Sequence, residues 1–84
     1  MSKFDISAIR ICFKKIRNKP TTIIANVEEE KKDELCRQLK RLFGCGGSVD
    51  KDGHVVLQGN HVIKLLADKE AYFGEKTVQK VETI

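Results

Sequence analysis

The chain has 84 residues, of which 40% are hydrophobic and 33% are charged, and its formal net charge at pH 7 is +4. A chain of this length can form one domain with a modest core, which excludes a multidomain protein, and no stretch approaches a membrane span. The positive charge favours an anionic partner.

Cysteine usage points to a reducing compartment. Three cysteines occur, Cys12, Cys36 and Cys45, and the N-terminal residues MSKFDISAIRI lack the apolar core of a signal peptide. An odd number of cysteines without a signal peptide is typical of reduced thiols. We therefore expect a cytoplasmic protein in which the thiols are small buried side chains.

The N-terminal third predicts a β-hairpin. Residues 9–14 alternate between apolar and polar side chains, as a strand with one buried face does. The stretch KKIRNKP, residues 14–20, is basic and contains the only proline, so it predicts a loop. Residues 21–27, TTIIANV, are rich in β-branched side chains and predict a second strand. The loop is too short for a crossover helix, so the two strands should pair antiparallel.

A helix should follow over residues 28–44. The sequence EEEKKDELCRQLKRLFG places acids at the start and bases at the end, as the helix dipole prefers. One stripe at helical spacing carries the apolar side chains Leu35, Leu39, Leu42 and Phe43. Gly44 follows this stripe, where a left-handed C-cap with positive φ is expected.

Glycines mark the turns of the next segment. The dipeptide Gly46-Gly47 predicts a bend into a third strand over residues 48–51. The dipeptide Asp52-Gly53 predicts a hairpin turn into a fourth strand over residues 54–58.

The C-terminal segment predicts a second helix and a last strand. Gly59 ends the fourth strand, and Asn60 is a good N-cap for the helix. The side chains expected on the buried side of this helix are Val62, Ile63, Leu66, Tyr72 and Phe73. Gly74 can end it, and residues 77–84 predict a fifth strand at the sheet edge.

The predicted order β-β-α-β-β-α-β indicates an α+β fold with two layers. About five strands should form one mixed or antiparallel sheet, with two helices packed on one face and the other face partly open. Residues 1–8 should be a short N-terminal tail, and residues 9–84 should be a single domain.

Three alternatives compete for the glycine-rich run after Phe43. A dinucleotide-binding loop is disfavoured because Val49 stands at the third glycine position and the run leaves a helix instead of entering one. A metal site could use four candidate ligands, Cys36, Cys45, His54 and His61, but no pair has the spacing of a zinc site. A thiol enzyme would need Cys45 as nucleophile, with His54 or His61 as base. We expect no enzyme, no cofactor and no metal, and we expect Cys45 to be a packing residue.

The basic loop is the strongest functional signal. Five cations and no acid fall between residues 10 and 19: Arg10, Lys14, Lys15, Arg17 and Lys19. The polar side of the first helix adds Arg37, Lys40 and Arg41, and the two groups of cations could merge into one patch. Such a patch favours nucleic-acid binding. The alternatives are a solvated loop or a protein-interaction module that uses the open sheet face.

Three segments resemble eukaryotic translation initiation factor 1 and its archaeal and bacterial relatives. They are IRICFKKIRNKPTTIIANV, then ELCRQLKRLFGCGGSV, then VVLQGNH. The resemblance covers residues 9–84, and the elements FGCGG and LQGN at this spacing carry most of it.

The resemblance implies a monomeric binding protein on the small ribosomal subunit near the decoding site, where it promotes scanning and start-codon fidelity. Its neighbours would be other initiation factors, the initiator tRNA and mRNA, with no membrane. The residues that would face ribosomal RNA are Lys14, Lys15, Arg17, Asn18 and Lys19 in the hairpin loop, and Arg37, Lys40 and Arg41 on the first helix.

The sequence also departs from that family. The loop over residues 50–54, DKDGH, is short, as in the archaeal and bacterial relatives, whereas a longer loop helps to sense the initiator tRNA in eukaryotic members. Ile16 stands at the expected hairpin tip where glycine is common, and Phe13 replaces a usually polar residue. The ending KVETI also differs.

Overall fold

The computed structural model describes residues 8–74 and 76–82, so most of the predicted tail and the last two residues of the predicted fifth strand lie outside the described part. The elements are β1 (Ile9–Ile16), β2 (Lys19–Ala25), α1 (Lys32–Phe43), β3 (Gly47–Val49), β4 (Val55–Gln58), α2 (Val62–Ala67), α3 (Lys69–Phe73) and β5 (Val78–Lys80). The α+β class is confirmed. The second helical region differs from the prediction because it divides into two short helices at Asp68.

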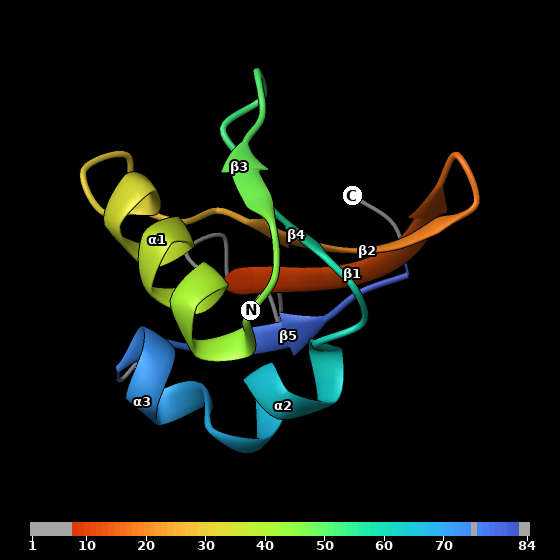
Figure 1. Cartoon of the computed structure of the whole chain (residues 1–84). Coiled ribbons are helices and arrows are strands. Elements are labelled where there is room, and N and C mark those ends of the chain that lie inside the picture. Colours follow the sequence, from red (N-terminus) through yellow and green to blue (C-terminus); the bar gives the residue numbers. More distant parts are fainter. Residues whose placement is uncertain (1–7, 75, 83–84) are drawn as a thin grey trace.

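One five-stranded mixed sheet organises the molecule, in the order β3-β4-β2-β1-β5. Only the pairing of β1 with β5 is parallel, and the other three pairings are antiparallel. Side chains of one sheet face and of all three helices form a single core cluster, in which Ile11, Ile24, Leu39, Leu57 and Leu65 are almost fully buried. The helices therefore cover one face, as expected (Figure 1).

The hairpin is longer and tighter than the sequence predicted. Strand pairing continues from Arg10 with Ala25 to Ile16 with Lys19, so only Arg17 and Asn18 form the turn. Both have positive φ, 54° and 66°, which is the backbone of a two-residue type I′ turn. The stretch predicted as a loop is thus mostly strand, because cross-strand hydrogen bonds continue past the last buried residue. Ile16 ends β1 and does not sit at the tip.

Helix α1 is placed by its apolar stripe, with one exception. Leu35 and Leu39 are buried, whereas Leu42 is 62% exposed. Leu42 lies on the same side of the helix as Leu35, so the periodicity was correct. The expectation that the whole stripe faces the core was wrong at Leu42, because none of the elements that the structure describes covers this side at the C-terminal end of α1.

Most side chains expected on the buried side of the second helical region do face the core, and Ile63 is the exception. Val62 and Leu65 are buried, while Ile63, expected inside, is 79% exposed. In a short helix the residues three apart share a face, so Val62 pairs with Leu65 and Ile63 points away. The N-cap of α2 is His61 and not Asn60, so the predicted cap was wrong by one residue; the Asn60 side chain accepts the Val62 N–H at 3.3 Å from the position before the cap.

Two glycines show why the turns need this residue. Gly44 has φ 60° in the left-handed region, which confirms the predicted C-cap. Gly47 has another reason, because a Cβ built on it would lie 2.6 Å from the Val56 carbonyl oxygen. The backbones of β3 and β4 approach too closely there for any side chain. Strand β3 accordingly begins at Gly47 and ends at Val49, two residues before the predicted end.

The sheet face without helices is closed at its centre. Cys12, Ile23 and Ala25 lie on this face and are buried. The chain after β5 continues alongside β1 in the same direction. There the Cys12 Sγ donates to the Glu82 carbonyl oxygen at 3.3 Å. The centre of this face offers little apolar surface to a partner. Among the described residues, no helix has both the length and the apolar character that crossing a bilayer requires.

Candidate nucleic-acid interface

The β1–β2 hairpin carries its cations outside the body of the protein. Lys14, Lys15, Arg17 and Lys19 are all exposed, and the hairpin reaches away from the three helices (Figure 1). Within residues 8–74 and 76–82, none of these four cations forms an ion pair. Their charges are therefore available to an anionic ligand.

Strand register distributes these cations over both sides of the hairpin. Lys14 and Lys19 lie on the same side of the hairpin, because Lys19 is the cross-strand partner of Ile16, two residues after Lys14. Lys15 and its cross-strand partner Pro20 lie on the opposite side. Arg17 and Asn18 form the end. A ligand that surrounds the tip would contact the cations on both sides of the hairpin. A flat ligand would contact only those on one side.

The hairpin is held by backbone pairing and by contacts at its base. The Gly59 N–H donates to the Pro20 carbonyl oxygen at 2.8 Å, and the Thr22 hydroxyl donates to the Gly59 carbonyl oxygen at 2.7 Å. Thr22 Oγ1 also accepts the His61 N–H at 3.0 Å. These bonds tie β2 to the start of α2, so the exposed cations stand on an ordered support.

The cations of helix α1 form a separate group. Arg37 and Arg41 are exposed and lie one turn apart, and Lys40 is half-buried, with its Cγ 3.3 Å from a Cβ built on Gly47. Figure 1 shows α1 and the hairpin tip on opposite sides of the molecule. The expected merging of the two groups into one patch is wrong, because α1 packs over β3 and β4 while the hairpin extends in another direction.

An aromatic cluster closes the C-terminal end of α1. The Phe43 ring stacks on the His61 ring, with centroids 4.7 Å apart and planes 9° apart. The Lys64 Nζ lies 5.9 Å from the Phe43 centroid. Lys64 is an exposed cation that no pattern in the sequence marks. No local signal could have found it, because the contact between Phe43 and Lys64 depends on how α2 packs.

The candidate metal ligands do not gather as one site in the described part of the chain. His54 groups with Asp50 and Asp52, whose ligand atoms lie within 4.8 Å of one another. The Asp50 Oδ1 accepts the N–H groups of Asp52 and His54, both at 2.9 Å, so this carboxylate already shapes the β3–β4 turn. His61 places its Nε2 2.7 Å from the Gln58 carbonyl oxygen. Cys36 and Cys45 belong to no such group.

Burial suppresses the reactivity of two of the thiols. Removal from water raises the pKa of Cys36 and of Cys45 above the ordinary thiol value, although Lys40 opposes the rise at both positions. A raised pKa keeps a thiol protonated near neutral pH, and the thiolate is the nucleophile. Cys45 also packs against the core. These observations favour the packing role predicted for Cys45 over that of a nucleophile.

Comparison with known proteins decides the family. A family model described as translation initiation factor SUI1 matches residues 6–69, which include the hairpin and α1. The chain belongs to the SUI1 family of translation initiation factors. The resemblance to initiation factors noted in the sequence is therefore confirmed. Elements α3, apart from its first residue, and β5 lie beyond the matched segment.

Archaeal members of the SUI1 family are close enough to support this membership. The chain is 36% identical over 85 residues to a protein translation factor SUI1 homolog of Methanopyrus kandleri, covering 94% of this chain and 78% of that protein. It is 42% identical to the homolog of Thermococcus onnurineus and 39% identical to that of Thermococcus gammatolerans, each over 66 residues. In both cases the match covers 71% of this chain and 66% of the relative.

Proposed function

We propose that this SUI1-family chain binds the small ribosomal subunit near the decoding site, in the cytoplasm, and promotes scanning and start-codon fidelity. The observation that carries the proposal is the hairpin, which projects four exposed cations without an ion pair among the described residues. The ligand would be ribosomal RNA phosphate. Family membership supplies the translational context.

An ordered hairpin suits this task better than a flexible loop. Strand pairing up to Ile16 and Lys19 already fixes the backbone, so binding would have to order only side chains. The positive φ is unfavourable for Arg17, whereas asparagine adopts such a φ readily, as at Asn18. The fold thus holds an arginine at the tip despite a conformational cost, and backbone strain of this kind gathers at functional sites.

Helix α1 would supply a second contact. Arg37 and Arg41 are exposed, and Lys40 is half-buried. Because these cations lie away from the hairpin, they would meet a different segment of ribosomal RNA. We expect their share of the binding free energy to be smaller, since Lys40 is partly held against β3 and the helix has no projecting geometry.

Salt dependence of subunit binding tests the proposal. Affinity for purified small subunits of an archaeon, a bacterium and a eukaryote would be measured between 50 and 200 mM salt. Each phosphate contact lowers log K by about 0.7–0.9 per tenfold rise in salt, so four contacts predict about a hundredfold loss over this range. The variant with Lys14, Lys15, Arg17 and Lys19 all changed to alanine should lose about three units of that slope.

A charge-matched control separates the hairpin from net charge. The control changes four other exposed lysines to alanine: Lys51, Lys64, Lys69 and Lys80. It carries the same net charge as the hairpin variant and should keep most of the slope. If the hairpin variant binds with unchanged affinity and slope, or if the control loses as much, the hairpin is not the site.

A further inference from the structure

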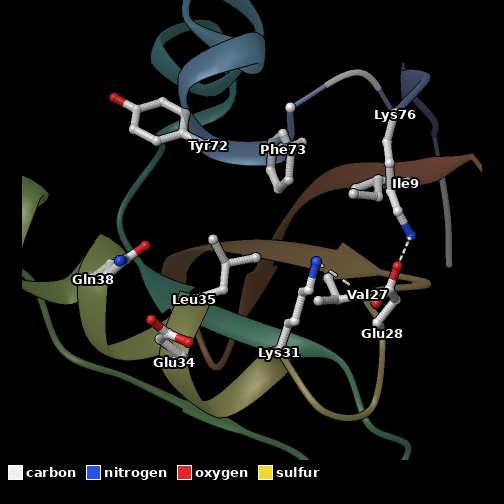
Figure 2. A pocket seen from close by; sticks show the side chains of 11 residues that line it. Ile9, Val27, Glu28, Lys31, Glu34, Leu35, Gln38, Tyr72, Phe73 and Lys76 are labelled. Atoms are coloured by element: carbon white, nitrogen blue, oxygen red, sulfur yellow. Dashed lines mark ion pairs between the residues drawn. The ribbon is translucent and has the colours of Figure 1, made fainter.

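A groove runs between α1 and the end of α3, away from the hairpin, and shares only Arg37 and Arg41 with the proposed RNA contacts. One hollow of about 340 Å³ has a floor formed by Ile9, Val27, Leu35 and Phe73. Figure 2 shows Tyr72 and Gln38 at one end of this hollow and Lys76 with Glu28 at the other. The floor is apolar and the rim is polar, which is typical of a site for a partner segment.

A second hollow continues the first along the same helix. Glu34, Gln38 and Tyr72 line both hollows, so the two join at these side chains. The second hollow adds Leu42 and Ala71. Leu42, which is 62% exposed, therefore extends the apolar floor of the groove instead of joining the buried part of its stripe. From Lys31 to Leu42 the groove follows about 16 Å of helix.

Charges at the groove favour an acidic ligand. Lys31 and Lys76 border one end, and Arg37 and Arg41 border the other. The acids on the lining are Glu28 and Glu34, and Glu28 is engaged by Lys76 at 2.7 Å and by Lys31 at 3.8 Å. Four cations thus stand against two carboxylates, and the two arginines form no ion pair within the part of the chain that the structure describes.

We propose that this groove binds an amphipathic helical segment of a partner protein, about three turns long, with apolar side chains on one side and acids flanking them. Apolar residues would cover Leu35, Leu42 and Tyr72, and acids would meet Arg37 and Arg41. A helix in a groove is a recurring mode of peptide recognition. RNA fits less well, because its phosphates would meet an aliphatic floor and Glu34 in the middle of the groove.

The inference goes beyond subunit binding and has a consequence for it. Arg37 and Arg41 border the groove and are also the α1 cations expected to face RNA. An acidic segment in the groove would compete with RNA for these two side chains, while leaving the hairpin untouched.

Peptide selection on the purified chain tests the groove. A display library of random 16-residue peptides would be selected on the wild-type protein and counter-selected on Leu42→Asp. Enriched peptides should be acidic, with apolar residues three and four apart. Dissociation constants of the synthetic peptides should rise at least tenfold with Leu42→Asp, because the new carboxylate removes an apolar contact and repels the acids.

The matched control is Ile63→Asp, which places the same charge on another exposed apolar residue outside the groove. This variant should bind the peptides within twofold of the wild type. The inference is overturned by enriched peptides that are neutral or basic, or by equal losses in both variants. It is also overturned if a 16-nucleotide RNA binds the groove more tightly than the peptides. Dimerisation that Leu42→Asp abolishes, or peptide binding that appears only after residues 1–7 are removed, would assign the groove to a second copy or to the chain's own N-terminus.

Discussion

The hairpin tip and the C-terminal end of α1 are both basic, but they differ in how closely their side chains pack against the core. The tip residues Lys15, Arg17 and Lys19 are exposed and contribute nothing to the core. At the end of α1, Phe43 packs against the core and Lys40 lies against β3. The cations of the first region make no packing contact, whereas in the second region Lys40 packs against β3 and Arg41 is exposed.

This difference predicts which changes separate binding from stability. A substitution at the hairpin tip should alter affinity for the ribosomal subunit and leave the free energy of unfolding nearly intact. A substitution where α1 leads into β3 should do the reverse. The three predictions below test or refine this division.

The largest effect is expected for Gly47→Val, at the start of β3. A Cβ at this position would lie 2.6 Å from the Val56 carbonyl oxygen and 2.9 Å from Leu57 Cδ2, so the backbone itself must shift. The free energy of unfolding should fall by about 3 kcal/mol. Thermal unfolding monitored by circular dichroism should show a drop in Tm of more than 10 °C, about what such a loss gives in a domain of this size.

Gly44→Val is the matched comparison. Among the described residues, no atom outside the adjoining backbone lies within 4 Å of a Cβ built on Gly44, so the positive φ is what opposes the side chain, and the loss should be about 1–2 kcal/mol. Both variants should bind small subunits normally below their melting temperatures. A Gly47→Val protein as stable as the wild type would show that β3 and β4 can separate without cost.

An intermediate effect of opposite sign is expected for Arg17→Gly. The positive φ of Arg17 costs about 1–2 kcal/mol for an L side chain, and glycine relieves this while losing about 0.5–1 kcal/mol of entropy. Stability should rise by about 0.5 kcal/mol, while the salt slope of subunit binding should fall by about 0.7–0.9. A lower Tm together with unchanged subunit binding would show that Arg17 serves stability and not binding.

The smallest effect is expected for Glu28→Gln, at the rim of the groove. The hydrogen bond from Lys76, helped by the charge of Lys31, lowers the pKa of the Glu28 carboxyl. A lowered pKa in the folded state stabilises the protein above the unfolded pKa, and this contribution is lost as the pH falls through the folded value. Wild type should have the slightly higher Tm at pH 7, and the difference should shrink as the pH is lowered below the ordinary pKa of a glutamate, 4.5. A difference independent of pH would indicate packing instead of charge.

Local chemistry determined much of this protein in advance. Alternation over residues 9–14 and the β-branched run over residues 21–25 indicated the centres of β1 and β2, although the sequence missed the burial of Cys12 and Ile23 on the second sheet face. The acids, the apolar stripe and Gly44 fixed α1 and its left-handed end. The hairpin cations were visible as an acid-free run, since most side chains of residues 14–19 are charged or polar and such side chains stay exposed.

Only the tertiary structure decided which side chains are covered by neighbouring elements. Leu42 and Ile63 read as core residues and are exposed, because periodicity gives the side of a helix but not whether another element covers it. The separation of Arg37 and Arg41 from the hairpin follows from the packing of α1 on β3 and β4, and the groove beside Leu42 forms where α1 meets Ala71 and Tyr72 of α3. Contacts between residues distant in the chain set all of these features, and no local pattern encodes them.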